Sequence, residues 1–525
     1  MLAVSIENFQ SVRKVQQVPL QGITLLYGNN SSGKSVIKDT LIVGAEMESG
    51  PANYWPKDEW INVHAFEQGE PVKLGYCFFL GQLAGLSGKQ FINDLIADSS
   101  LTGKQVDVSS IDTDDEGVAA LTSYLVDAVV YVEYSWPAEG FFSDGGECDT
   151  TALIRLGLPG ATDSIELNTL AEVTFKHEGG VTVAFNNAHE LIETTKKWLN
   201  ESTFINSEDL ECLQVGSSKC YYDDNPLIER YRWAKQDEWG ENDTDVGFLL
   251  TFFCVAGAHL CVANASRLEF VGDVREPFEE KQGDIYLGAD YWNKLKSLVL
   301  RDELGFDSYM GEVERINKWL CGKEYLNSGY ELSAEFKFLV SLSDLKDSAT
   351  LGSKSHLLEI TEKNSLDYSR LMLKDARTGR LVAFSDVGTG ISQVMPILYH
   401  MARSGLFGSA IYVQQPELHL HPKLQASMAQ IFIESFITND KSKNIIIETH
   451  SELIILRMLK VIRKNYATEN LLKDRALLAE DVNVIFAVKD DGGVTTYQNL
   501  RISKDGDFLD KWPEGFFEER DQELF

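Results

Sequence analysis

The chain has 525 residues, which is enough for more than one folding module. Its 44% hydrophobic and 24% charged residues are ordinary for a globular protein, but 80 acidic against 48 basic residues give a formal net charge of −32. Such a surface repels nucleic-acid phosphate, so long-range attraction to DNA or RNA is excluded and any contact would need a local basic patch.

The bulk composition also indicates the compartment. Seven cysteines are scattered without a Cys-x-x-Cys pair, a pattern typical of reduced thiols in a cytosolic chain rather than of disulfides or a zinc site. The first residues, Met1–Glu7, lack the basic and long apolar regions of a signal peptide. Gly247–Ala265 runs for 19 residues without a charge, but Thr251, His259 and Asn264 within it favour a buried helix over a membrane span. We therefore expect a cytoplasmic protein with no membrane partner.

The most informative segment follows the apolar run Ile23–Tyr27. Residues Gly28–Ser35 read GNNSSGKS, a complete G-x-x-x-x-G-K-[ST] phosphate-binding loop, and a helix is predicted from Val36. The two glycines let the backbone curl so that N–H groups converge on a phosphate, and the helix N-terminus adds positive potential. Lys34 is expected to neutralise the β/γ-phosphate oxygens, and the Ser35 hydroxyl to ligate Mg²⁺. The sequence therefore predicts a nucleoside triphosphate site formed by Gly28, Asn29, Asn30, Ser31, Ser32, Gly33, Lys34 and Ser35.

The middle of the chain has a different character. Residues 100–118 are polar and acidic, and predict an exposed loop. Ala171–Phe185 alternates around Gly179-Gly180, which predicts a β-hairpin. Further alternating stretches between Glu331 and Phe384 predict strands, including a hairpin over Leu371–Val382.

Strand and helix signals of another kind lie near the C-terminal end. Ala410–Val413 and Asn444–Glu448 are short apolar runs with β-branched residues, typical of strands buried on both faces of a sheet. Leu424–Phe436 between them has helical spacing. A P-loop α/β sheet is therefore expected to be assembled from both ends of the chain.

The best candidate for a basic patch is a predicted helix in this same region. It carries Arg457, Lys460, Arg463 and Lys464, with Lys473 and Arg475 just beyond it. Nucleic acid is a candidate partner only through this stretch, and a solvated helix face is the alternative interpretation.

Six further segments stand in order along the chain: Ile6–Val12, Phe270–Glu276, Ser385–Leu398, Gln414–Pro422, Glu448–Glu452 and Lys511–Glu519. Together with the phosphate loop, they resemble ABC-type ATPases of the AAA_15/OLD-like group, and especially bacterial proteins with a DUF3696 C-terminal domain. In that family the six segments are the first strand, a "GPLRE" stretch, the signature segment, the Walker B strand with the D-loop, the switch-histidine segment and a C-terminal "DWPxGFFDE". Within the segment that resembles "GPLRE", Asp273 and Val274 replace the proline and the leucine of the family. The resemblance covers about half the chain.

The resemblance implies an α/β fold, with a P-loop ABC-type head built from N- and C-terminal segments and an α+β insertion in the middle. On this basis residues 1–75 form the N-terminal part of the head with the Walker A loop, and residues 76–330 form an inserted α/β region, the candidate recognition surface for a partner. Residues 331–480 hold the signature, Walker B, D-loop and switch histidine, and residues 481–525 form the DUF3696-like tail.

The signature segment is expected to act on a second subunit. In such ATPases a serine hydroxyl and glycine N–H groups meet the γ-phosphate that the opposite subunit holds, just ahead of a helix N-terminus. The resemblance assigns this role to Ser385, Gly388, Gly390, Ser392 and Gln393.

Three histidines follow the signature segment. His450 follows a buried-type strand, and a neutral imidazole there reaches the γ-phosphate or the lytic water. His419 and His421 are two residues apart, but the resemblance places them in the D-loop, which disfavours a metal site.

The sequence departs from the family at the end of the Walker B strand. ABC-type sites place there an acid that orders the Mg²⁺ shell and then an acid that activates water, whereas this chain has Gln414 and Gln415. Glutamine keeps the geometry of glutamate, but lacks the charge that favours Mg²⁺ and cannot act as a general base. Two explanations stay open: slow natural hydrolysis with help from Glu417 or Glu448, or a Gln414 introduced in place of a natural glutamate to trap ATP. The predicted catalytic set is Gln414, Gln415, Glu417 and His450, and the predicted metal ligands are Ser35 and Gln414.

These residues predict an ABC-type ATPase that binds ATP and Mg²⁺ and dimerises head to tail, with weak or blocked hydrolysis. The resemblance implies a homodimer, or a higher oligomer of dimers, that gates a nuclease or toxin effector encoded nearby in bacterial anti-phage defence. The alternatives are an ATP-dependent nuclease of the OLD type, a DNA-repair ATPase, and a non-hydrolysing scaffold with bound ATP.

Overall fold

The structure is a computed structural model of the chain. It describes residues 3–46, 65–67, 69–79, 128–136, 151–159, 167–176, 181–185, 268–272, 290–303, 311–338, 366–403, 410–467, 475–513 and 517. The predicted loop at residues 100–118 and the uncharged segment at residues 247–265 lie outside these residues. No helix in the described ranges is both long and apolar enough to cross a membrane.

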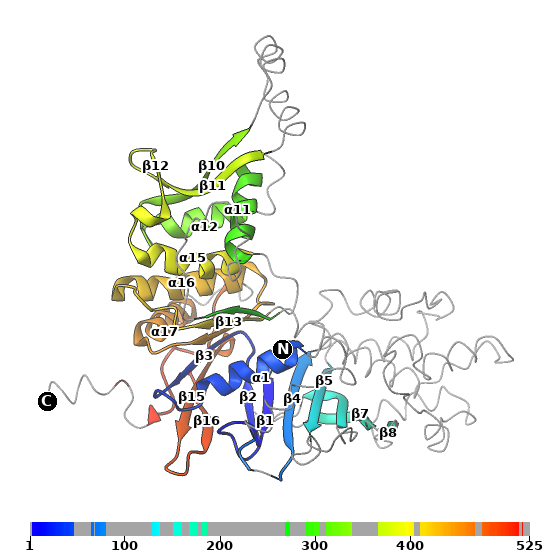
Figure 1. Ribbon diagram of the computed structural model, residues 1–525. Helices are drawn as coiled ribbons and strands as arrows, with labels where there is room; N and C mark the ends of the chain where they lie inside the picture. Colours follow the sequence, from blue (N-terminus) through cyan, green and yellow to red (C-terminus); the bar gives the residue numbers. More distant parts are fainter. Residues whose placement is uncertain are drawn as a thin grey trace, which may run out of the picture.

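A six-stranded sheet of mainly parallel strands lies at the centre of the described chain (Figure 1). Its order is β16 (Thr495–Asn499), β15 (Val482–Lys489), β3 (Ile23–Gly28), β14 (Asn444–Glu448), β13 (Ala410–Gln414) and β9 (Glu269–Val271). β3 pairs in parallel with both β14 and β15. The expectation that both ends of the chain build one α/β sheet is therefore confirmed, as are the two predicted apolar strands.

Helices cover this sheet because its central strands are mainly apolar and are buried along their whole length. Every residue of β3 and β14 is buried, and burial of each large aliphatic side chain contributes about 1.5–3 kcal/mol. α16 (Pro422–Thr438) contacts β3 and β14 and packs on α17 (Glu452–Ala467), which confirms the helix predicted between the two strands. α1 (Lys34–Glu46) contacts β3 on one side and a second sheet on the other.

The second sheet is antiparallel throughout its seven described strands. Its order is β2 (Gln16–Pro19), β1 (Ala3–Glu7), β4 (Val72–Phe79), β5 (Val129–Trp136), β6 (Thr151–Pro159), β7 (Leu167–Lys176) and β8 (Val181–Phe185). The hydroxyl of Tyr76 on β4 donates to the carbonyl oxygen of Thr40 in α1 at 2.7 Å. β7 and β8 form the predicted hairpin, although its Gly-Gly turn lies outside the described residues.

A smaller unit stacks on the helical layer (Figure 1). Its three described strands are β10 (Tyr330–Phe338), β11 (Leu366–Asp375) and β12 (Leu381–Val382), and β11 with β12 forms the hairpin predicted near Leu371–Val382. α11 (Asp290–Glu303) and α12 (Glu312–Cys321) pack between this sheet and α15 (Thr389–Ala402), which in turn contacts α16.

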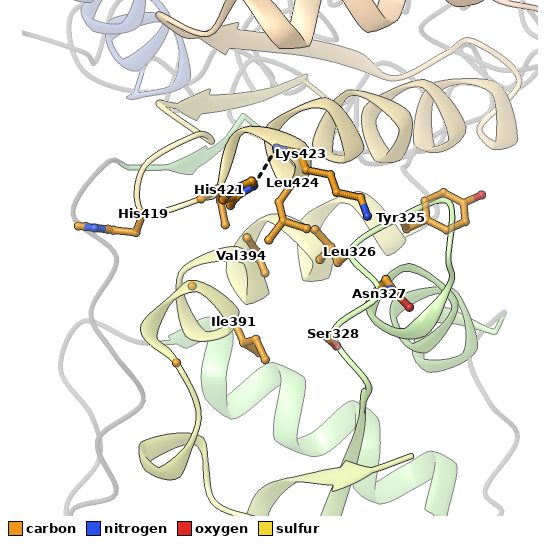
Figure 2. A pocket seen from close by; sticks show the side chains of 13 residues that line it. Tyr325, Leu326, Asn327, Ser328, Ile391, Val394, His419, His421, Lys423 and Leu424 are labelled. Atoms are coloured by element: carbon orange, nitrogen blue, oxygen red, sulfur yellow. Dashed lines mark hydrogen bonds between the residues drawn. The ribbon is translucent and has the colours of Figure 1, made fainter. Parts of the chain in front are cut away.

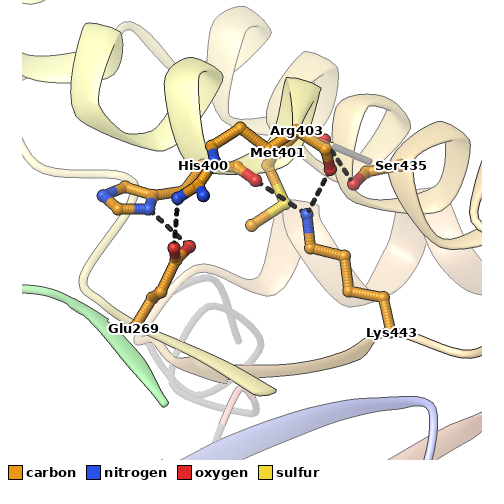
Figure 3. Close-up of polar contacts among 6 residues, drawn as sticks. All are labelled: Glu269, His400, Met401, Arg403, Ser435 and Lys443. Atoms are coloured by element: carbon orange, nitrogen blue, oxygen red, sulfur yellow. Dashed lines mark hydrogen bonds and ion pairs between the residues drawn. The ribbon is translucent and has the colours of Figure 1, made fainter. Parts of the chain in front are cut away.

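A buried lysine ties the start of β14 to the end of α15 (Figure 3). Lys443 is 2% exposed, and its Nζ donates to the carbonyl oxygens of His400 at 2.7 Å and Arg403 at 3.3 Å. The last carbonyl groups of a helix have no hydrogen-bond donor within the helix. The ammonium group of Lys443 provides that donor here. Glu269, in β9, accepts from Nδ1 of His400 at 2.7 Å and pairs with Arg403. The end of α15 is therefore joined to two strands of the six-stranded sheet.

This lysine predicts a pH dependence of stability. Burial lowers the pKa of Lys443 from 10.5 to about 7, although Glu269 acts in the opposite direction. Between pH 7 and 10.5 the lysine is protonated in the unfolded chain but mostly neutral in the folded chain. The free energy of unfolding therefore rises with pH over this range, because the cost of burying a charged ammonium group is relieved. We expect the wild type to gain about 1.5 kcal/mol over Lys443→Met between pH 7.0 and 8.5 in urea unfolding. Lys504→Met, at an exposed position, is the matched control; parallel profiles for all three proteins would contradict the prediction.

Candidate nucleotide site

The phosphate loop connects β3 to α1 and adopts backbone angles that require glycine. Gly28 has φ of 142° and Gly33 has φ of 100°, a region that side chains other than glycine rarely enter. A Cβ atom on Gly28 would lie 2.6 Å from the carbonyl oxygen of Ala487 and 2.6 Å from Oγ of Ser32. The loop therefore curls tightly against β15, and its first glycine has no substitute.

Lys34 opens α1 and folds back over the loop that precedes it. Its Nζ donates to the carbonyl oxygens of Gly28 at 2.8 Å and Asn29 at 2.9 Å, and the residue is 5% exposed. An ammonium group has three N–H donors, so one remains for a ligand. Burial lowers the pKa of Lys34, while the nearby carboxylate of Glu448 acts in the opposite direction.

Two serines in the loop differ in exposure. The Oγ of Ser32 is buried and has no hydrogen-bond partner among the described residues, a state that costs about 1–3 kcal/mol. Ser35, in the first turn of α1, is exposed. An unsatisfied hydroxyl inside the loop and an exposed hydroxyl beside it fit a ligand with several acceptor oxygens and an associated Mg²⁺.

The loop is held from the other end of the chain. Thr495, which begins β16, donates from Oγ1 to the carbonyl oxygen of Ser32 at 2.8 Å. Tyr497 on the same strand donates to the carbonyl oxygen of Gly33 at 2.8 Å. No sequence pattern identified these two residues, because nothing local relates them to a loop more than 460 positions away.

β13, the predicted Walker B strand, ends beside an acidic residue of β14. β13 and β14 run in parallel with Gln414 directly opposite Glu448. Nε2 of Gln414 donates to Oε2 of Glu448 at 3.1 Å, and the hydroxyl of Tyr412 donates to the same atom at 3.0 Å. The backbone N–H of Gln415 donates to the carbonyl oxygen of Glu448 at 2.7 Å. Glu448 itself is 8% exposed.

The second acidic residue of this edge, Glu417, is engaged differently. Its Oε2 accepts from the hydroxyl of Thr449 at 2.8 Å, and its Oε1 accepts from the backbone N–H of His450 at 2.7 Å. Burial and then the charge of Lys34 lower the pKa of His450 below 6.5, so its imidazole is neutral at pH 7. The structure therefore gathers the phosphate loop, Gln414, Glu417 and His450 at one edge of the sheet.

Two of the predicted signature residues line a separate cavity (Figure 2). Gly388 precedes α15 as its N-cap, and Gly390 lies in the first turn. Both line a cavity of about 470 Å³ whose other walls are the D-loop and the turn after α12, and no phosphate-loop residue lines it. Ser385, three residues before Gly388, is exposed and donates to Oδ1 of Asp386 at 3.2 Å. Ser392 is buried in α15, and Gln393 is half-buried beside it.

The two D-loop histidines do not gather metal ligands. His421 accepts the backbone N–H of Lys423 on Nδ1 at 3.3 Å and so caps α16, and His419 has a positive φ of 62° (Figure 2). Among the described residues there is no group of three or more histidine, cysteine, aspartate or glutamate side chains that could hold a metal ion.

The C-terminal tail packs against the base of the phosphate loop. Tyr27, the residue before Gly28, is fully buried and donates its hydroxyl to the carbonyl oxygen of Ser451 at 3.0 Å. Trp512 and Phe517 meet the Tyr27 ring edge-on, with centroids 5.2 and 5.4 Å away. The tail thus reaches the loop through one aromatic cluster.

The predicted basic helix is α17, and part of its charge is already paired. Arg463 donates to the carbonyl oxygen of Gly506 at 3.1 Å and pairs with Asp507, so it docks the tail rather than facing a ligand. Lys460 and Lys464 are exposed, and Lys473 lies outside the described residues.

Comparisons with known proteins match two segments of the chain. Residues 324–455 match the family model described as AAA ATPase domain (AAA_15), and residues 477–525 match DUF3696, described as a protein of unknown function. The predicted resemblance to these two families is confirmed for the matched segments. No curated protein matches the sequence.

Three solved structures whose alignments cover nearly the whole chain are SMC head domains. One is a head bound to the C-winged helix domain of ScpA, with a TM-score of 0.40, 10% identity, and coverage of 95% of this chain and 98% of that one. The head domain from Thermotoga maritima has a TM-score of 0.31, 10% identity and the same coverage. A head with an extended coiled coil, bound to the C-terminal domain of ScpA derived from Pyrococcus furiosus, has a TM-score of 0.31, 11% identity, and coverage of 100% and 98%.

Proposed function

We propose that this protein binds ATP with Mg²⁺ between two copies of itself, arranged head to tail, and that the ATP-bound dimer controls a partner effector. The observation that carries the proposal is the division of the site. The phosphate loop, Gln414 and His450 converge at one edge of the sheet, whereas Gly388 and Gly390 line a separate cavity. Two half-sites in one chain are complete only when a second copy supplies the missing half.

Each group at the sheet edge has a part in holding the triphosphate. Backbone N–H groups of the loop and the N-terminus of α1 attract phosphate oxygens, and the unsatisfied hydroxyl of Ser32 donates to one of them. Lys34 places its charge at the β/γ-phosphates. Mg²⁺, when bound through Ser35 and the Gln414 position, neutralises further charge on the phosphates. The neutral imidazole of His450 accepts a hydrogen bond from the lytic water or donates one to the γ-phosphate.

Turnover is expected to be weak because Gln415 occupies the position of the usual general base. Gln415 cannot accept a proton, and both oxygens of Glu417 already accept hydrogen bonds from Thr449 and His450. A positioned base contributes roughly 10²–10⁴-fold to rate, so its loss leaves ATP bound for a long time. Multiple-turnover phosphate release at an ordinary ATPase rate, on the order of 10 s⁻¹, would contradict the proposal.

Gly388→Ala separates the role of the signature segment from folding. Gly388 has φ of −60°, and an added Cβ would meet nothing within 4 Å among the described residues, so the fold itself does not need this glycine. If a γ-phosphate held by the other copy approaches Gly388, the extra methyl group blocks it. We expect Gly388→Ala to keep wild-type stability and monomeric ATP binding, but to lose the ATP-dependent dimer in light scattering coupled to size-exclusion chromatography.

The control for this experiment is Gly272→Ala, where an added Cβ also meets nothing within 4 Å among the described residues. It should dimerise like the wild type. Normal ATP-dependent dimerisation of Gly388→Ala would overturn the composite site. Equal dimer formation and effector output with ATP and a non-hydrolysable analogue would favour the non-hydrolysing scaffold, which the glutamine pair also supports.

The proposed effector and biological setting rest on the family resemblance alone. ATPases of this group stand beside nucleases or toxic proteins in bacterial anti-phage defence, and we place this protein in that setting. Co-purification of the product of an adjacent gene with the wild type but not with Gly388→Ala would support an effector gated by the dimer. Activity of that product unaffected by the ATPase would argue against it.

A further inference from the structure

We propose that Glu448 supplies the negative charge to the Mg²⁺ shell that the Walker B strand of this chain lacks. The inference rests on the proposed ATP site and assigns one residue within it. Gln414 occupies the position of the usual acid, and the neighbouring strand places a carboxylate directly beside it. The negative charge is therefore present at the end of β14 instead of at the end of β13.

The strand register creates this arrangement. Gln414 ends β13 and Glu448 ends β14, and the two residues are partners in a parallel pair. Neighbouring strands lie about 4.8 Å apart, so a side chain at the end of one strand can reach a ligand that is bound at the end of the next strand. β14 also pairs with β3, the strand that leads into the phosphate loop. Glu448 therefore stands between the Walker B strand and the loop.

The contacts of Glu448 orient its carboxylate without neutralising it. Both side-chain hydrogen bonds that it accepts from described residues, from Gln414 at 3.1 Å and Tyr412 at 3.0 Å, end on Oε2. Both donors are uncharged, and Oε1 keeps its lone pairs for a ligand. The ammonium group of Lys34 hydrogen-bonds the loop carbonyls instead, so it attracts Glu448 only through space.

Burial makes an unpaired charge at this place costly. Glu448 is 8% exposed, and a buried carboxylate without a hydrogen-bonded cation destabilises the folded chain unless a positive ligand compensates it. Mg²⁺ prefers oxygen ligands and usually takes one or two carboxylates together with substrate phosphates. An oriented carboxylate beside a phosphate loop meets that requirement.

The hydrogen bonds of Glu417 argue against a role for it as the Mg²⁺ ligand. Each of its oxygens already accepts a hydrogen bond, from Thr449 and from the backbone of His450, so it fixes the switch-histidine turn. Between the two acids that the sequence left open, Glu448 is the one with an oxygen, Oε1, that accepts no hydrogen bond from the described residues. Since it replaces the metal-ordering acid and not the base, ATP and Mg²⁺ stay bound while hydrolysis stays slow.

The test measures how much Mg²⁺ strengthens nucleotide binding, by calorimetry with the non-hydrolysable analogue AMP-PNP in Mg²⁺ or in EDTA. We expect the wild type to bind at least about tenfold more tightly with Mg²⁺, and Glu448→Gln to bring this ratio close to one while keeping its affinity in EDTA. Glu417→Gln should keep the wild-type ratio. The transposed pair Gln414→Glu with Glu448→Gln should restore it.

Mn²⁺ binding gives a second readout that does not depend on turnover. Electron paramagnetic resonance should show bound Mn²⁺ with AMP-PNP for the wild type and the transposed pair, and free Mn²⁺ for Glu448→Gln. A wild-type Mg²⁺ ratio in Glu448→Gln would overturn the assignment, and so would a transposed pair that binds AMP-PNP in EDTA without recovering the ratio. A wild type that binds no nucleotide in either buffer would instead overturn the proposed function.

Discussion

Replacing Lys34 with alanine should weaken ATP binding at least about 100-fold without unfolding the protein. The ammonium group is held 2.8 and 2.9 Å from two loop carbonyl oxygens. In the proposed site it would neutralise phosphate charge there and shield those carbonyls from the phosphates. A hydrogen bond to a charged group contributes about 1.5–3 kcal/mol, and the exposed carbonyls add repulsion. A 100-fold change corresponds to about 2.7 kcal/mol, which is within this range.

The measurement is calorimetric titration with AMP-PNP and Mg²⁺. Lys38→Ala is the matched control, because Lys38 lies one turn further along α1 and pairs with Asp39. It should bind nucleotide like the wild type. If Lys34→Ala and Lys38→Ala had the same affinity, the phosphate loop would not be the nucleotide site, and the proposed function would fail with it.

Local patterns in the sequence were sufficient to predict three strands of the central sheet, β3, β13 and β14. The strands at Ala410–Val413 and Asn444–Glu448 could be predicted because parallel strands buried on both faces are apolar along their whole length. The phosphate loop could be predicted because its glycines and its lysine stand within eight residues. Features of this kind can be recognised from residues that are close together in the sequence.

Contacts between distant segments could not be predicted in the same way. Thr495 and Tyr497 hold the loop from 463 and 464 positions away, and β9 joins the sheet edge with three residues, too short to leave a periodic signal. The sequence also left Glu417 and Glu448 as equal candidates. They differ only through the register of β13 and β14 and through the hydrogen bonds that each carboxylate accepts.

The C-terminal tail also makes contacts with distant segments that the sequence did not predict. The predicted boundary at residue 481 separates a tail from the head, yet β15 pairs with β3 along its length and β16 continues the same sheet. Beyond them, the described aromatic residues Trp512 and Phe517 of the tail do not form a separate surface. They pack where the phosphate loop begins, which gives the DUF3696-like segment a physical connection to the nucleotide site.

Trp512→Ala should therefore lower both the stability of the protein and its affinity for ATP. The indole ring lies 5.2 Å from the ring of Tyr27, 4.8 Å from Phe517 and 5.1 Å from Phe508, measured between centroids. Loss of a large aromatic side chain from such a cluster costs about 3 kcal/mol in unfolding free energy. Tyr27 directly precedes Gly28, so a looser Tyr27 also loosens the loop, and we expect several-fold weaker binding of AMP-PNP.

Two variants distinguish positioning of the loop from general destabilisation. Trp512→Phe keeps an aromatic ring against Tyr27 and should recover most of the affinity for AMP-PNP, although part of the stability is lost with the smaller ring. Leu509→Ala, at a position of the same tail that is 60% exposed, should behave like the wild type in urea unfolding and in calorimetry. If Trp512→Ala lost stability but bound AMP-PNP as tightly as Leu509→Ala, the tail would support the fold alone. A Trp512→Ala variant that loses affinity at temperatures well below its melting transition, and regains it with phenylalanine, would establish that the tail holds the phosphate loop in its binding conformation.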